Sequence, residues 1–119
     1  MPWTLVNQSK NHQLWSHSAI NASGTNSSDA LACGAFQQMD IQTLHTVHDD
    51  TSSYGTDWSN DAGTTWERAG AVITTAGVSG STSRSVDGMP GALFRLTVTE
   101  VDLNASARLT PYVTLKKKG

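Results

Sequence analysis

Serine, histidine and acidic residues are the side chains with which this sequence could support catalysis or metal binding. Ser79 and Ser81 lie in a stretch rich in glycine and serine, but it lacks the Gly-x-Ser-x-Gly spacing of a nucleophile elbow, so we interpret it as a loop. His45 and His48 are three residues apart and point to opposite faces of an extended strand. This disfavours a shared metal ion, although a surface cation site with acidic residues 49–50 is a minor alternative. The remaining acidic residues are scattered, so the sequence predicts no catalytic residue, no metal site and no cofactor.

One short motif has a recognisable spacing. The pattern Ser-x-Asp-x-Gly-x-Thr-Trp is formed by Ser59, Asp61, Gly63, Thr65 and Trp66. It resembles the Asp-box of sialidases and related β-proteins, which is a hairpin device. We expect the Asp61 carboxylate to accept backbone N–H groups, Gly63 to supply a positive φ, and Trp66 to pack back as the next strand starts. Sialidases carry several copies on propeller blades and place their catalytic residues elsewhere, so this single copy predicts a structural hairpin.

The composition excludes several functional classes. The charged fraction is only 15%, which is unlike the surface of a helical bundle. A net charge of −2 offers no attraction to nucleic acid or an anionic membrane, and no apolar run approaches the roughly 20 residues of a membrane span. Cys33 is alone and cannot form an internal disulfide, and the first ten residues do not resemble a signal peptide. We therefore expect a protein that folds in a reducing cytosol.

Alternation of apolar and polar residues predicts three clear strands, over residues 39–48, 92–99 and 107–116. The residues expected to face the core are Met39, Ile41, Thr43, His45 and Val47; Ala92, Phe94, Leu96 and Val98; and Ala107, Leu109, Val113 and Leu115. Because proline cannot donate to a ladder, Pro111 predicts an edge position or a bulge for the last strand. Residues 12–20, 51–58 and 71–75 are further extended segments, whereas residues 76–90 are predicted as a long loop with at most a brief strand.

These segments predict an all-β fold, a single antiparallel β-sandwich or jelly-roll-like domain of about seven to eight strands. We place the sandwich domain at residues 12–116, between an N-terminal arm at residues 1–11 and a basic C-terminal tail at residues 117–119. The arm carries Trp3, Leu5 and Val6, apolar side chains that a lone domain would have difficulty burying. It is interpreted as an extended arm or an edge strand, and these three residues are the predicted partner-binding site.

The order of segments resembles that of small structural proteins of tailed bacteriophages, most closely head decoration, or cement, proteins. The resemblance covers residues 30–115 and rests on a Ser/Thr-rich strand region, the hairpin at residues 59–66, and the segments 71–75, 90–95 and 96–99. It implies an all-β domain on the virion surface, often a homotrimer, that clamps adjacent capsomers of the expanded head. The implied partners are the major capsid protein and neighbouring decoration subunits, and no catalytic residue carries over.

Three alternatives remain open from the sequence. The chain could be a phage tail or neck component, which would have the same pattern of segments. It could be a carbohydrate-binding module, if two or more aromatic rings are coplanar and exposed; the available rings are Trp15, Trp58, Trp66, Tyr54 and Tyr112. A small hydrolase would need a cleft with converging acids or a Ser/His pair.

Overall fold

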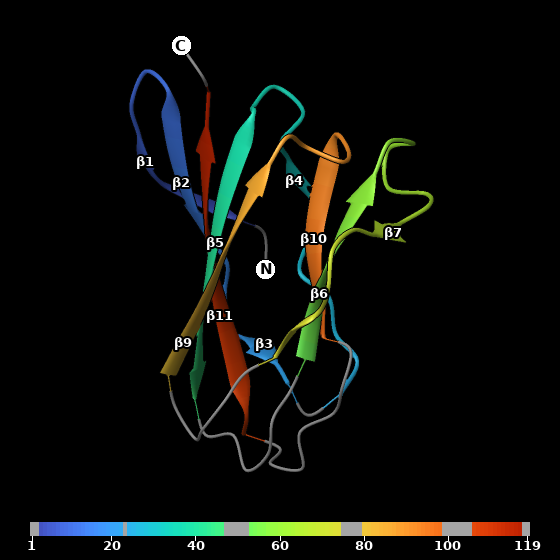
Figure 1. Cartoon of the computed structure of the whole chain (residues 1–119). Helices are drawn as coiled ribbons and strands as arrows, with labels where there is room; N and C mark the ends of the chain where they lie inside the picture. The colour runs from blue at the N-terminus through green and yellow to red at the C-terminus, as the bar shows by residue number, and fades with distance from the viewer. Residues whose placement is uncertain (1–2, 23, 47–52, 75–79, 99–105, 118–119) are drawn as a thin grey trace.

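The computed structural model describes residues 3–22, 24–46, 53–74, 80–98 and 106–117 (Figure 1). These residues contain no helix and form two antiparallel sheets packed face to face, which confirms the predicted β-sandwich. The described strands are β1 Thr4–Gln8, β2 His12–Ser16, β3 Ile20–Asn21, β4 Leu31–Ala32, β5 Gln38–Thr46, β6 Ser53–Ser59, β7 Glu67–Arg68, β8 Ile73–Thr74, β9 Gly80–Asp87, β10 Leu93–Val98 and β11 Arg108–Lys116. Their number, eleven, exceeds the predicted seven to eight.

Each sheet has two outer strands. Sheet A has the order β1-β2-β11-β5-β9, and β3 pairs with β11 further along the edge that β2 occupies. Sheet B has the order β4-β10-β6-β7, and β8 pairs with β6. Strands β1 and β9 are therefore the outer strands of sheet A (Figure 1).

The three strands predicted from alternation are confirmed as β5, β10 and β11. Their buried inward-facing residues are Met39, Ile41, Thr43 and His45; Phe94, Leu96 and Val98; and Leu109, Val113 and Leu115, with Ala107 buried just before β11. Ala92 differs from the prediction, since it precedes β10 and is exposed, and Val47 lies outside the described residues. Phe94 occupies the core between two tryptophans, with ring centroids 5.0 Å from Trp58 and 6.4 Å from Trp3.

Pro111 lies in the interior of sheet A, so the predicted edge position is wrong. It pairs with Thr43 of β5, and its carbonyl accepts a hydrogen bond of 3.2 Å from the backbone N–H of His17. The N and C=O of one strand residue point to the same neighbour, so the proline nitrogen faces His17 as well. His17 lies between β2 and β3, where the ladder along β11 is interrupted. Because proline has no backbone N–H, Pro111 lacks a hydrogen-bond donor at the position opposite the gap between β2 and β3.

Strand β9 corrects the prediction of a long loop at residues 76–90. It pairs with β5 without a register shift from Gln38↔Asp87 to His45↔Gly80. Apart from Arg84 and Val86, its side chains are small and polar, and alternation of apolar residues is nearly absent, which is why the sequence pattern missed it. An outer strand with solvent on one face needs few apolar groups, because the backbone ladder itself holds it in place. The two-residue strands β4 and β7 also add to the number, since they are too short to show a period. Strand β8 lies within the predicted extended segment 71–75, and β3 begins at the end of the predicted segment 12–20.

The N-terminal segment is an edge strand rather than a free arm. Residues Thr4–Gln8 pair with β2, with a register shift between Leu5 and Asn7. Trp3 is only 8% exposed and belongs to the core, where its indole N–H donates to the Asp29 carbonyl at 2.8 Å. The domain therefore buries Trp3 without any partner.

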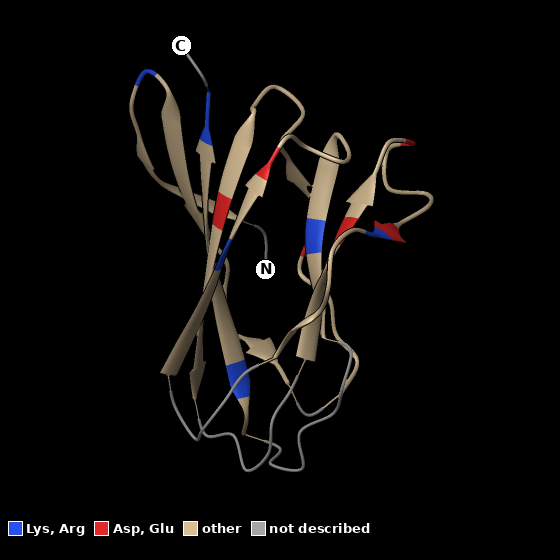
Figure 2. Cartoon of the chain, in the orientation of Figure 1, with Lys and Arg blue, Asp and Glu red and all other residues tan. Residues whose placement is uncertain are grey.

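Charged residues of the described chain are distributed over both sheets. Figure 2 shows lysine and arginine at separate positions, with aspartate and glutamate between them. At the end of β11, the backbone N–H of Lys117 donates to the Asn11 carbonyl at 2.9 Å, and the Lys117 ammonium lies 5.3 Å from the Phe36 ring centroid. The first residue of the predicted basic tail is thus packed against the sandwich, and residues 118–119 lie outside the described part.

Candidate functional site

The Asp-box hairpin follows β6 and is held by hydrogen bonds from its first residues. The Asp61 carboxylate accepts bonds of 2.8 Å from the Ser59 hydroxyl and from the backbone N–H of Thr65. The Gly63 N–H donates to the Ser59 hydroxyl oxygen at 2.9 Å. The Thr65 N–H and the Ser59 hydroxyl lower the pKa of Asp61 below its usual value. These are the contacts expected of the motif, and they fix the turn in one conformation.

Trp66 ends the hairpin on the outer face of sheet B. Its ring is half-buried, and the Arg95 guanidinium carbon lies 4.4 Å from the ring centroid. A cation above an aromatic face is attracted by the ring quadrupole. Trp66 therefore packs back as expected, but onto a charged residue of β10 and outside the core cluster.

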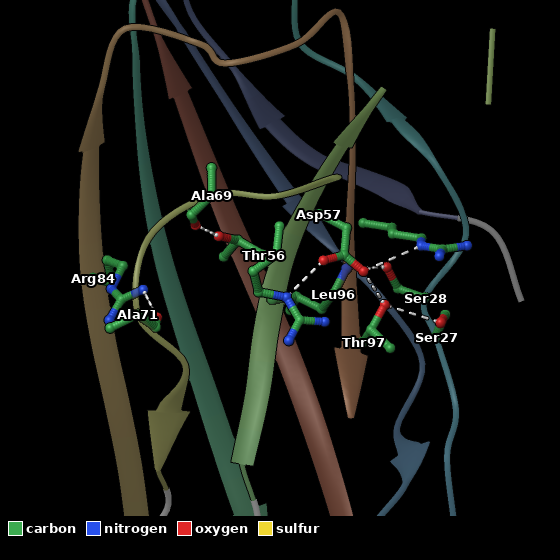
Figure 3. Close-up of polar contacts among 11 residues, drawn as sticks. Ser27, Ser28, Thr56, Asp57, Ala69, Ala71, Arg84, Leu96 and Thr97 are labelled. Atoms are coloured by element: carbon green, nitrogen blue, oxygen red, sulfur yellow. Dashed lines mark hydrogen bonds and ion pairs between the residues drawn. The ribbon is translucent and has the colours of Figure 1, made fainter. Parts of the chain in front are cut away.

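An ion-pair cluster centred on Asp57 joins the hairpin to sheet B. Asp57 is buried in β6, and its carboxylate accepts hydrogen bonds of 2.7 Å from Arg68 Nε and from the Thr97 hydroxyl (Figure 3). Arg95 Nε lies 3.6 Å from the same carboxylate. Burial raises the pKa of Asp57, but the hydrogen bonds from Arg68 and Thr97 and the positive charges outweigh burial and lower this pKa below its usual value.

Gly55 makes this cluster sterically possible. A Cβ atom at Gly55 would lie 2.1 Å from Arg68 Nε, so the arginine side chain extends directly over the glycine. Arg68 of β7 thereby contacts Asp57, which is the next outward-facing residue of β6 after Gly55. This cluster is not among the predicted sites, although the sequence contains a signal for it: Asp57 is the one charged residue in the segment Ser53–Ser59. A charge inside an otherwise buried strand predicts an opposite charge on its neighbours.

A polar groove of about 380 Å³ adjoins the hairpin. Its main lining residues are Trp58, Asn60, Asp61, Thr65, Glu67 and Arg68. Trp58 is 4% exposed, and its indole N–H is buried with no hydrogen-bond partner among the described residues. The volume lies within the range of about 300–1,000 Å³ that is typical of small-ligand sites.

The predicted partner-binding residues divide into two groups. Trp3 is buried in the core, whereas Leu5 and Val6 of β1 are 39% and 55% exposed. Leu5 pairs with Trp15 of β2, whose ring is half-buried. The edge of sheet A therefore presents a small apolar surface, which we call the β1 edge, formed by Leu5, Val6 and Trp15.

The candidate catalytic and metal-binding residues are not brought together in the described part of the chain. His45 is buried and faces the core, while Ser81 is exposed on β9. The described ranges contain no group of three or more His, Cys, Asp or Glu residues that could hold a metal ion. Ser79, His48 and residues 49–50 lie outside these ranges.

The aromatic rings form no exposed platform. Trp58 and Tyr54 are buried, and the rings of Trp15, Trp66 and Tyr112 are half-buried. Two coplanar exposed rings, which would favour a carbohydrate-binding module that stacks sugars, are therefore not present among these residues.

Comparison of the sequence with protein-family models and with curated proteins finds no match. Within the described residues, no helix is long and apolar enough to cross a membrane.

Proposed function

We propose that this chain is a non-enzymatic structural protein of a tailed-bacteriophage virion, which binds the capsid shell as a decoration, or cement, protein. The observation that carries the proposal is the β1 edge. Leu5 and Val6 are the most exposed large apolar residues of β1, and both lie on an outer strand where another chain has access. Leu5 and Val6 are 39% and 55% exposed, so a contact that completes the burial of either side chain contributes roughly half of the 1.5–3 kcal/mol of a full burial, before ordering costs.

The bulge in β1 favours docking through side chains. A register shift interrupts the ladder between Leu5 and Asn7, and such irregularities disfavour continuous strand addition at an edge. Val6 lies at this shift and is more exposed than any other large apolar residue of the described chain. We therefore expect Leu5 and Val6 to insert into an apolar depression on the major capsid protein or on a neighbouring decoration subunit, in a homotrimer.

A decoration protein stabilises its shell by mass action. It binds the assembled lattice and not the free capsid subunits, so it shifts the assembly equilibrium toward the shell. This role needs no catalytic residue and no cofactor. The phage tail or neck is the alternative location. The same docking chemistry would apply there, so the experiment must distinguish binding to heads from binding to tails.

Co-sedimentation with particles of the encoding phage tests the proposal. The purified chain should co-sediment with empty expanded heads, should saturate at a fixed number of copies per capsomer, and should not bind isolated tails. Binding to tails alone would assign the chain to the tail or neck. If the genome that encodes this chain encodes no major capsid protein, the proposal is wrong.

A further inference from the structure

Strand β9 forms the edge of sheet A opposite to β1 (Figure 1). The Gly88 N–H donates to the Gln37 carbonyl at 2.7 Å, in continuation of the β5–β9 register. Backbone groups of successive residues in an antiparallel strand point alternately to one side and the other. Every second residue before Gly88 therefore bonds to β5, and the residues between them direct N–H and C=O away from β5. These residues are Ser81, Ser83, Ser85 and Asp87, and the described part of the chain offers their backbone groups no partner.

This edge lacks the features that usually prevent another strand from adding, such as a bulge, a proline, a lysine or a very short strand. Strand β9 runs for eight residues without a register shift and contains neither proline nor lysine. An inward-pointing charge can also protect an edge, but the Arg84 guanidinium donates to the Ala71 carbonyl in the link between β7 and β8 (Figure 3). Strand β1, in contrast, has a register shift, and the described edge strands β3, β4, β7 and β8 have two residues each.

Strand β9 is also held in an extended conformation before any partner arrives. Besides its ladder with β5, the Thr82 hydroxyl lies 2.6 Å from the Thr43 hydroxyl, and the Ser85 hydroxyl donates to the Asp40 carboxylate at 2.7 Å. Strand addition costs least when both strands are already ordered, because a flexible peptide must lose its chain entropy on binding. A second copy of this chain supplies an ordered strand with matching donors and acceptors.

The charges on β9 select the register of such a pair. Two copies related by a twofold axis perpendicular to the sheet pair antiparallel and keep their outer faces on the same side. An axis at Arg84 would place two arginines directly opposite each other, which is destabilising. An axis at Ser85 would bring Asp87 into the new ladder. An axis at Ser83 pairs Ser83 with its counterpart and Ser81 with Ser85 of the other copy, and it avoids both charges.

We propose that β9 pairs antiparallel with β9 of a second copy of this chain, about a twofold axis at Ser83, so that the two A sheets form one continuous sheet. A single pair of strands buries little surface, so the contact is weak and depends on protein concentration. The contact leaves β1 accessible at the opposite edge of sheet A. The inference therefore does not depend on the proposed function, and its test needs no phage particles.

Sedimentation equilibrium of the full chain between about 10 µM and 1 mM tests the contact, since weak interfaces dissociate in this range. The wild type should show a reversible monomer–dimer equilibrium. Ser83→Pro removes an N–H that the β5 ladder does not use, so the variant should fold and should dimerise at least about tenfold more weakly. Gln8→Pro is the matched control on the opposite edge, where the Gln8 N–H donates to the Asn7 side chain, and it should dimerise like the wild type. A wild type that stays monomeric at 1 mM, or a folded Ser83→Pro protein that dimerises equally well, would overturn the proposal.

Disulfide cross-linking tests the register and does not require proline to be tolerated. In this register the two Ser83 Cα atoms lie about 5.5 Å apart, within the range of a disulfide, whereas the two Ser85 Cα atoms are separated by about 13 Å along the strands. Ser83→Cys should therefore form a covalent dimer under mild oxidation, and Ser85→Cys should form at least about tenfold less. The wild type controls for Cys33, which is buried, and burial raises the pKa of its thiol to about 12. Equal cross-linking of the two variants, or none in Ser83→Cys, would contradict the assigned contact.

Discussion

At the scale of single residues, the Asp-box turn concentrates backbone strain at two neighbouring positions. Ala62 has a φ of 61° and Gly63 a φ of 88°, which is the left-handed region. A Cβ atom at Gly63 would have ordinary contacts, the nearest being 3.6 Å from Trp66, so only backbone strain opposes a side chain. Gly63→Ala should therefore lower the free energy of unfolding by about 1–2 kcal/mol, measured by urea denaturation.

The neighbouring position supplies the matched control. Ala62→Gly relieves strain of the same kind, so it should be neutral or slightly stabilising in spite of the larger chain entropy of glycine. Gly24→Ala, at a site without a positive φ, should change stability by less than about 1 kcal/mol. A Gly63→Ala protein as stable as the wild type would show that the turn relaxes to another conformation.

A second prediction at this scale concerns the buried carboxylate of Asp57. Asp57→Asn should lower stability by about 1.5–3 kcal/mol at neutral pH, because it weakens charged hydrogen bonds from Arg68 and leaves Arg95 near a neutral group. The pKa of Asp57 is lowered in the folded protein, so its contribution is complete above the unfolded value near pH 4 and is lost as pH falls through the folded pKa. The stability difference between wild type and variant should thus shrink below about pH 4 in urea melts.

Asp87→Asn is the control for the loss of one negative charge, since Asp87 is an exposed acid at the end of β9. It should leave the free energy of unfolding at neutral pH unchanged. A difference between wild type and Asp57→Asn that stays constant down to pH 3 would mean that the Asp57 charge does not stabilise the fold.

At the scale of elements, the N-terminal strand combines a structural residue with exposed ones. Trp3→Ala removes a core side chain and should lower the free energy of unfolding by about 3 kcal/mol or more. Leu5→Ala changes a side chain that is 39% exposed and should cost less than about 1 kcal/mol. Thermal or urea unfolding of the two variants separates these outcomes. Equal stabilities would show that β1 is not anchored through Trp3.

The elements also show what the sequence could predict. Strands β5, β10 and β11 were predictable because each has one face on the core, which imposes a period of two on residues such as Ile41 and Phe94. Strand β9 was not, because an outer strand of serine and threonine is held by its ladder with β5 and shows no such period. The interior position of Pro111 depends on a gap between β2 and β3, a feature of the neighbouring strands that its own segment does not encode.

The sequence predicts some of the candidate sites and not others, because some depend on residues close in sequence and others on the tertiary register. The Asp-box is local, so Asp61 and Gly63 could be assigned from spacing alone. The cluster of Asp57, Arg68 and Arg95 joins three strands, and only the tertiary register brings these residues together. Burial of Trp3 likewise depends on the Asp29 carbonyl and the Phe94 ring, both remote in sequence.

At the scale of the whole molecule, the described residues form a packed core between the two sheets, yet the β1 edge stays accessible. The core cluster includes residues from both sheets and Trp3, whereas Leu5 and Val6 remain at the surface. The structural role of the N-terminal segment and its proposed docking role are therefore carried by different side chains. This separation allows docking to be tested in a protein that stays folded.

The affinity of a Leu5→Asp/Val6→Asp double variant for empty phage heads tests the central claim most directly. The two exposed positions tolerate charge in the free domain, so the melting temperature should stay close to that of the wild type. Val72→Asp, at another exposed apolar residue with 43% exposure, is the matched control. We predict that the double variant co-sediments with heads at least about tenfold more weakly, since loss of two buried apolar contacts exceeds 1.4 kcal/mol. The control should bind like the wild type. Equal binding of all three proteins would contradict docking through the β1 edge.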